Sequence, residues 1–246
     1  MTQLKVVSWN IFGGRDVPGV IKGLRELDAD IIGLQEVLES EDGGENNARE
    51  IAEALGYSWL YAPTQLLVPS SSYVLTQLGI GEKKWWGNAL LSRYPMSDKQ
   101  VHTLSETSKR TALEATVTVD GARLRVLSTH LVHGGERAAE VRNAQVERLV
   151  AAISSDVPAI VMGDFNATPE SASVKRVGSV LVQTERDLTR PTIGLHPELY
   201  HGPGGATDRL RLDYIFATSD LSVIETGTFD SDASDHIPVY AILNVP

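Results

Sequence analysis

Hydrophobic residues follow two different periods along the chain, and these periods alternate from one segment to the next. Residues 17–30 carry apolar side chains at Val20, Ile21, Leu24 and Leu27, which is the spacing of one helix face. Short continuous apolar runs, typical of buried strands, lie between segments of this kind. The pattern predicts helices over 17–30, 46–56 and 136–153 and strands over 4–9, 31–37, 57–62, 88–93, 157–164, 211–218 and 237–243.

Residues 110–131 have the pattern of a β-hairpin. Two apolar runs flank Asp120-Gly121, and Asp-Gly favours the tight turn that joins antiparallel strands. The sheets are therefore not purely parallel. Strands and helices alternate without a linker or a change in composition, so we expect a single α/β domain over residues 1–246.

Two long segments, 63–87 and 189–209, show neither period. Long irregular loops in compact domains often carry function. The first segment contains Lys83, Lys84, Trp85 and Trp86, which could stack on a nucleic-acid base or touch a membrane surface. They could equally form a packed loop with an exposed lysine pair.

Composition narrows the possible partners. The formal net charge is −10, whereas proteins that cover the phosphates of duplex DNA are usually basic. The substrate is therefore small, or contact with a polyanion is local and assisted by a bound cation. The chain has no cysteine, no basic and apolar leader, and no run of roughly 20 apolar residues, so we expect a cytoplasmic protein without disulfides.

Polar side chains stand at several strand ends, directly beside apolar residues. In "VMGDFNATPE" (161–170), Asp164 ends an apolar run and Asn166 follows two residues later, on the same face of an extended chain. Each such residue alone has an ordinary explanation as a turn, cap or surface charge. Burying several without partners costs about 1–3 kcal/mol each, which suggests one shared site or cation. The set comprises Asn10, Glu36, Asn88, His130, Asp164, Asn166, Asp213, Asp235 and His236.

Three other histidines, His102, His133 and His196, have no such setting, and we interpret them as ordinary residues. Arg110 could clamp a phosphate through two parallel hydrogen bonds, or it could pair with one of the many carboxylates.

Taken in order, seven motifs resemble the endonuclease/exonuclease/phosphatase superfamily, which includes DNase I. The resemblance runs from residue 8 to residue 241. It implies a four-layered α/β sandwich, in which two mixed, mainly antiparallel sheets pack face to face with helices outside. It also implies a phosphoesterase that depends on Mg²⁺ or Mn²⁺. The motifs are "SWNIFGG", "LQEV", "GNALLSRYP", "STHL", "GDFNATPE", "RLDYIFAT" and "SDHIPVYA".

The same resemblance implies roles for the metal and water side of the site. Glu36 would be the principal metal ligand, with Asn10 beside it, since carboxylates suit a hard cation that bridges to phosphate. Asp164 and Asn166 would position the attacking water and a phosphate oxygen.

Further roles follow for the residues around the phosphate. His236 would be a general base or a phosphate contact, oriented by Asp235 through its other ring nitrogen. His130 would contact the phosphate or help to protonate the leaving group, and Asp213 would support these groups. Asn88, and Arg110 as a phosphate clamp, would bind substrate.

At two positions the sequence differs from the pattern of the abasic-site endonucleases of this superfamily. Those enzymes typically have an acidic residue at the position of Phe12 and a tyrosine at that of His130. The substrate class stays open between nucleic acid, a phospholipid head group and a small phosphorylated metabolite, with membrane lipid the weaker option and no protein partner inferred. The alternative is a non-catalytic binding or scaffold protein on the same fold, although no matched position is lost.

Overall fold

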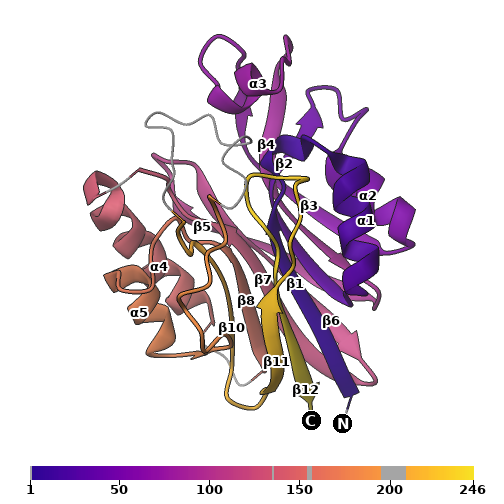
Figure 1. Cartoon of the computed structure of the whole chain (residues 1–246), viewed down its shortest axis with the longest axis vertical. Coiled ribbons are helices and arrows are strands. Elements are labelled where there is room, and N and C mark those ends of the chain that lie inside the picture. Colours follow the sequence, from indigo (N-terminus) through magenta and orange to yellow (C-terminus); the bar gives the residue numbers. More distant parts are fainter. Residues whose placement is uncertain (1, 135, 154–156, 195–208) are drawn as a thin grey trace.

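The computed structural model describes residues 2–134, 136–153, 157–194 and 209–246. This part of the chain forms two six-stranded sheets that face each other (Figure 1). The first has the order β11-β12-β1-β2-β4-β3, and the second has the order β5-β6-β7-β8-β10-β9. The strands of the first are β1 (Thr2–Asn10), β2 (Ile31–Ser40), β3 (Ser58–Leu67), β4 (Lys84–Ser92), β11 (Ser222–Thr228) and β12 (Val239–Val245). Those of the second are β5 (Met96–Ser105), β6 (Arg110–Val119), β7 (Ala122–His130), β8 (Ala159–Asp164), β9 (Val182–Gln183) and β10 (Asp213–Ala217).

Each sheet contains one parallel pair, and its other pairs are antiparallel within the described residues. The parallel pair β1–β2 is connected through helix α1 (Val17–Leu27), and β7–β8 through helix α4 (Ala139–Ile153). A parallel pair needs such a crossover because the chain must return to the same end of the sheet. The prediction of mixed, mainly antiparallel sheets is confirmed.

Apolar residues form three successive layers of core. Leu4, Leu113 and Met162 belong to the layer between the sheets. A second layer packs α1 and α2 (Asn47–Leu55) on the first sheet, and a third packs α4 and α5 (Ala172–Gly178) on the second sheet. The sheets approach closely at Gly33, where an added Cβ would lie 2.6 Å from the Met162 Sδ. The predicted four-layered sandwich is confirmed (Figure 1).

Capping and turn residues in the sequence correctly predict where several helices and strands begin or end. Asn46 caps α2 by accepting a hydrogen bond from the Arg49 backbone N–H at 3.1 Å, and Gly56 ends it in the left-handed conformation with φ 72°. Asp120 and Gly121 both have positive φ in the predicted hairpin turn. Helix α1 ends at Leu27, earlier than predicted, because Asp28 adopts φ 48°. The predicted helices and strands are present, with ends that differ by a few residues.

The prediction of a long irregular segment over 63–87 is wrong. Strand β3 continues to Leu67, the short helix α3 (Tyr73–Gln77) follows, and β4 begins at Lys84. Lys84 is buried and pairs with Glu82 at 2.6 Å and with Glu45 at 3.1 Å. Trp86 is also buried, so residues 83–86 are not an exposed loop cluster.

The other irregular segment, 189–209, lies largely outside the described residues, as does His196. In the part of the chain that the structure describes, no helix has the length and apolar character needed to cross a bilayer.

Candidate active site

Glu36 projects from a β-bulge in β2. Leu34 pairs with Ala89 and Val37 with Gly87, so Gln35 and Glu36 together oppose a single residue of β4. Glu36 has φ 58°, a left-handed conformation that costs a residue with a side chain about 1–2 kcal/mol. Bulges redirect side chains and are frequent next to active sites. This bulge therefore holds the Glu36 carboxylate at the wall of a cavity of about 580 Å³.

Three polar residues form one row across the second sheet. His130 of β7 is the register partner of Asp164 of β8, and Asp164 is the partner of Asp213 of β10. Gly163 has φ 153°, and an added Cβ there would lie 1.9 Å from the Thr129 carbonyl oxygen. Only glycine permits this close approach of β7 and β8, which sets Asp164 beside His130.

Asp164 and Asn166 meet as predicted, although not through strand alternation. Strand β8 ends at Asp164, and Asn166 adopts φ 49°. The Asn166 backbone N–H donates to Asp164 Oδ1 at 2.8 Å, which is an Asx-type turn. The Asn166 side-chain Nδ2 donates to the Leu131 carbonyl oxygen at 3.1 Å, and this contact fixes the orientation of the amide.

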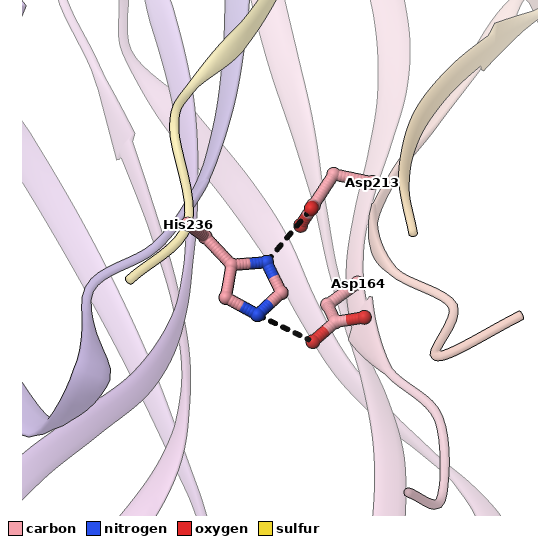
Figure 2. A group of neighbouring side chains, drawn as sticks. All are labelled: Asp164, Asp213 and His236. Atoms are coloured by element: carbon pink, nitrogen blue, oxygen red, sulfur yellow. Dashed lines mark hydrogen bonds and ion pairs between the residues drawn. The ribbon is translucent and has the colours of Figure 1, made fainter. Parts of the chain in front are cut away.

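His236 lies between two carboxylates (Figure 2). Its Nδ1 donates to Asp213 Oδ2 at 2.8 Å, and its Nε2 lies 3.8 Å from Asp164 Oδ2. Burial disfavours a charged imidazole, but the charges of Asp213 and Asp164 outweigh burial and raise the pKa of His236 well above its ordinary value. Thr192 Oγ1 donates to the same Asp213 oxygen at 2.6 Å. His236 is thus the cationic histidine of the site.

The prediction that Asp235 orients His236 is wrong. Asp213 occupies the Nδ1 side of the imidazole because the sheet register and Thr192 hold it there. Asp235 lies near Glu36 instead, and its charge helps to raise the pKa of that residue. Burial in turn raises the pKa of Asp235. Two carboxylates therefore share one corner of the cavity.

The corner formed by Glu36 and Asp235 fits a divalent cation. Burial, followed by the charge of Asp235, raises the pKa of Glu36 to about 7. Glu36 Oε2 is buried and has no hydrogen-bond partner among the described residues. A hard cation with oxygen ligands would bind the unpartnered oxygen and offset the repulsion between the two carboxylates.

Asn10 links this corner to the row on the second sheet. Its Nδ2 donates to Glu36 Oε1 and to Asp164 Oδ2, both at 3.1 Å. Its Oδ1 accepts from the Phe12 backbone N–H at 3.1 Å. An amide oxygen has two lone pairs, so one stays available to a cation while the Asn10 amide nitrogen orients two carboxylates.

A second group, Asp164, Asp213 and His236, also has donor atoms close enough to hold a metal ion, all within 4.8 Å of one another. Here, however, the raised pKa of His236 means that a proton already offsets the carboxylate charge. At Glu36 and Asp235 the pKa values of the carboxyl groups are raised, in both cases mainly by burial. We take the corner of Glu36 and Asp235 as the candidate cation site.

Arg110 and His130 present unpaired N–H groups to the cavity. The Arg110 guanidinium lies 4.4 Å from the centroid of the Trp86 ring, and its Nε and Nη1 are buried without partners among the described residues. Burial lowers the pKa of Arg110 to about 10, which leaves it charged at neutral pH. Burial and then the Arg110 charge lower the pKa of His130 to about 3, so this histidine is neutral.

The tautomer of His130 follows from its neighbour. Asn166 Nδ2 lies 2.8 Å from His130 Nε2. Because Asn166 Nδ2 also donates to the Leu131 carbonyl oxygen, it is the amide nitrogen and acts as a donor toward His130. His130 Nε2 therefore accepts, and Nδ1 carries the proton. His130 Nδ1 is buried and has no partner among the described residues, and the His130 side chain belongs to the cavity lining.

His133, interpreted from the sequence as an ordinary residue, also lines the cavity. Its Nδ1 lies 3.0 Å from Asn166 Oδ1. The one signal in the sequence was its position three residues beyond His130, just past the end of β7. Asn88, in contrast, is buried away from the cavity lining and donates to the Thr111 carbonyl oxygen at 3.2 Å.

The structure thus gathers most of the predicted residues at one place. Asn10 and Asp213 lie one hydrogen bond behind the cavity wall. The predicted residues that line the cavity itself are Glu36, Arg110, His130, Asp164, Asn166, Asp235 and His236.

The pKa of His236 provides a direct test of this geometry. Asp213→Asn removes a negative charge and weakens the acceptor at Nδ1, so the pKa of His236 should fall by one unit or more, roughly the effect of losing a close opposite charge. NMR titration of the imidazole C–H signals measures the pKa. Asp232→Asn, an exposed change in the same segment as His236, is the matched control and should leave the pKa within a few tenths. An unchanged pKa in Asp213→Asn would contradict the contact.

Comparison with known proteins agrees with this architecture. The sequence model of the Endonuclease/Exonuclease/phosphatase family matches residues 7–236. No curated protein matches the chain in sequence. An endonuclease/exonuclease/phosphatase from Beutenbergia cavernae has a similar structure, with a TM-score of 0.81 and 23% identity over 100% of this chain and 72% of that one.

Two similar structures have more specific descriptions. A mannosyl-6-phosphatase from Bacteroides thetaiotaomicron has a TM-score of 0.72 and 19% identity over 98% of this chain and 100% of that one. D. rerio TDP2 in complex with a single-strand DNA product has a TM-score of 0.76 and 17% identity over the full length of both chains. At these identities the likeness shows a shared fold.

Proposed function

Because the chain belongs to the endonuclease/exonuclease/phosphatase family, we propose that it is a divalent-metal-dependent phosphoesterase in which water attacks phosphorus. Members of this family are hydrolases that include nucleases and phosphatases. The observation that carries the proposal is that one cavity gathers the Glu36 and Asp235 carboxyl groups, a row of titratable groups, and two residues, Arg110 and His130, with unpaired N–H groups among the described residues.

Glu36 and Asp235 would hold the cation, either Mg²⁺ or Mn²⁺. A bound divalent ion there supplies positive charge to a phosphate oxygen and orients the ester. Asn10 as a direct ligand stays a prediction, and its oxygen accepts one hydrogen bond, from the Phe12 N–H, which leaves a second lone pair for a cation. Its amide nitrogen keeps the Glu36 carboxylate aligned with that of Asp164.

Asp164 would accept the proton of the attacking water. Its Oδ1 accepts from the Asn166 backbone N–H, and its Oδ2, which also accepts from Asn10 Nδ2 at 3.1 Å, faces the His236 imidazole and would be the basic oxygen. His236 is not the base in this scheme, because Asp213 and Asp164 favour its protonated form. The imidazolium would instead stabilise the negative charge that develops on the phosphate.

Arg110 and His130 would bind the remaining phosphate oxygens. Each has an N–H group without a partner in the described part of the chain. Since His130 is neutral at physiological pH, it would bind the phosphate through Nδ1–H rather than act as a strong acid. His133, held by Asn166 at the same cavity, is available near the leaving group.

The proposal predicts metal-dependent hydrolysis of a phosphodiester. Purified protein should cleave bis(4-nitrophenyl) phosphate with Mg²⁺ or Mn²⁺, lose this activity in excess EDTA, and regain it when the ion is restored. A parallel panel holds plasmid DNA, an abasic-site oligonucleotide, single-stranded RNA, sphingomyelin and an inositol phosphate, and it identifies the natural class. A folded protein that is silent with every ion would favour the non-catalytic binding protein instead.

A further inference from the structure

The cavity that holds the candidate catalytic groups is also lined by apolar residues. Glu36, Asp164 and His236 line one part of it, and residues from the end of β3 and from α3 line another. Phe12 also lines it, with its ring 6.5 Å from the ring of Tyr73. We name the part formed by Leu66, Leu67, Val68, Tyr73, Val74 and Phe12 the apolar wall.

The apolar wall is exposed where it borders the mouth of the cavity. Val68 is 37% exposed and Tyr73 is 43% exposed. Among the described residues eight large hydrophobic side chains are exposed, and three of them, these two and Leu210, line this one cavity. Single exposed apolar residues are ordinary, whereas several around one concave site mark a place where an apolar group binds.

The apolar wall is also held in place by the fold. Leu75 of α3 is fully buried with Leu38, Leu67 and Trp86 in a separate small core. Ser72 caps the helix by accepting from the Leu75 backbone N–H at 3.2 Å. These contacts anchor α3 while its first residue, Tyr73, faces outward, so the binding surface exists before any ligand arrives.

Few basic side chains line the cavity among the described residues, which favours a ligand with a single phosphate. Arg110 is the one lysine or arginine among the described lining residues. A polynucleotide that is bound along its backbone needs a row of cations, and this chain has a net charge of −10. A cavity of about 580 Å³ is in the range of small-molecule sites, about 300–1,000 Å³.

We propose that the substrate is a small, soluble phosphate ester with an apolar substituent, and that the apolar wall binds this substituent while Arg110 and His130 hold the phosphate. This inference rests on the proposed phosphoesterase function and specifies its substrate class. Specificity would arise because only esters with an apolar group bury it against the wall as the phosphate reaches the catalytic groups.

The test compares octyl 4-nitrophenyl phosphate with methyl 4-nitrophenyl phosphate, which have the same charge and leaving group. The wild type should cleave the octyl ester with a kcat/KM at least about tenfold higher, because each buried methylene favours binding by about fourfold. Val68→Asp and Val68→Ser should each lower the ratio of the two kcat/KM values several-fold, because Val68 is one of the six residues of the apolar wall. Val180→Asp is the matched control, since Val180 is 48% exposed and lies outside the cavity lining, and it should keep the wild-type ratio.

The outcomes separate the two proposals. Equal cleavage of both esters by the wild type overturns the inference and leaves the phosphoesterase function intact. An octyl preference that is unchanged in both Val68 variants does the same. Cleavage of neither ester, nor of any other phosphate ester in the panel, contradicts the proposed function. Calorimetric titration with octylphosphonate and methylphosphonate then decides the role of the apolar wall independently: at least tenfold tighter binding of octylphosphonate supports it, and equal binding overturns it. Cleavage confined to phospholipid in phosphatidylglycerol vesicles would overturn the assignment to a soluble ester.

Discussion

Asp164→Asn is expected to lower the turnover number for a phosphodiester by about 10²–10⁴-fold, the usual contribution of a positioned general base. Asparagine has nearly the same size but accepts no proton from the attacking water. It also removes one of the two charges that keep His236 protonated. His236→Ala should cause a loss of similar size, because the imidazolium next to the phosphate disappears. Turnover at saturating Mn²⁺ measures both effects.

Glu170→Gln is the matched control for this prediction. Glu170 lies in the same segment as Asp164, six residues further along, but it is exposed and does not line the cavity. Its substitution should leave turnover within about twofold of the wild type. Circular dichroism and thermal unfolding establish that each variant is folded. A folded Asp164→Asn or His236→Ala protein with wild-type turnover would remove the residue from the proposed mechanism.

Glu36→Gln is expected to weaken Mn²⁺ binding by at least about 100-fold and to abolish the metal-dependent activity. A neutral amide offers one weak oxygen ligand in place of a carboxylate. Isothermal titration with Mn²⁺ measures the affinity without reference to any substrate.

The same substitution should stabilise the metal-free protein at alkaline pH. The pKa of Glu36 rises from an ordinary value of 4.5 to about 7 on folding, so the folded state binds its proton more tightly than the unfolded state. The stability of the metal-free wild type therefore falls as the pH rises between these two values, by about 3 kcal/mol. Glutamine does not ionise, so metal-free Glu36→Gln should unfold at a higher temperature than the metal-free wild type at pH 8. At pH 4 the two proteins should unfold at similar temperatures.

Glu41→Gln serves as the control, because Glu41 follows the same strand but is exposed and pairs with Lys83 at 3.9 Å. It should change neither Mn²⁺ affinity nor the pH dependence of unfolding. Retained Mn²⁺ affinity in Glu36→Gln would move the cation to the group of Asp164, Asp213 and His236.

The sequence predicts the fold well where local chemistry decides the structure. The Asp120-Gly121 turn, the Asn46 cap and the Gly56 terminus are all read from adjacent residues. Strand β5 is missed because it is an edge strand whose side chains are mostly exposed and polar, so it shows no apolar period. Helix α3 is missed because its five residues are shorter than two helical turns.

The sequence predicts which residues form the site but not the contacts between them. The motif order identifies the polar residues that converge, whereas their contacts depend on strand register between distant segments. Asp213 reaches His236 because it lies beside Asp164 in the sheet, a relation that no local spacing encodes. For the same reason the sequence could not show that Asp235 lies near Glu36 or that His133 reaches the cavity. The extent of a single domain over residues 1–246 stays a prediction.

The pairing of β1 with β12 has a consequence for how activity develops during synthesis and refolding. Thr2 pairs with Val245 and Ser8 with Val239, so segments more than 230 residues apart in the sequence must meet before the first sheet is complete. Asn10 ends β1, and His236 stands shortly before β12. A ribosome-bound chain that has not yet released β12 therefore has not assembled the candidate site. Closing such long loops is slow, so in a refolding experiment hydrolysis should return with the slowest kinetic phase.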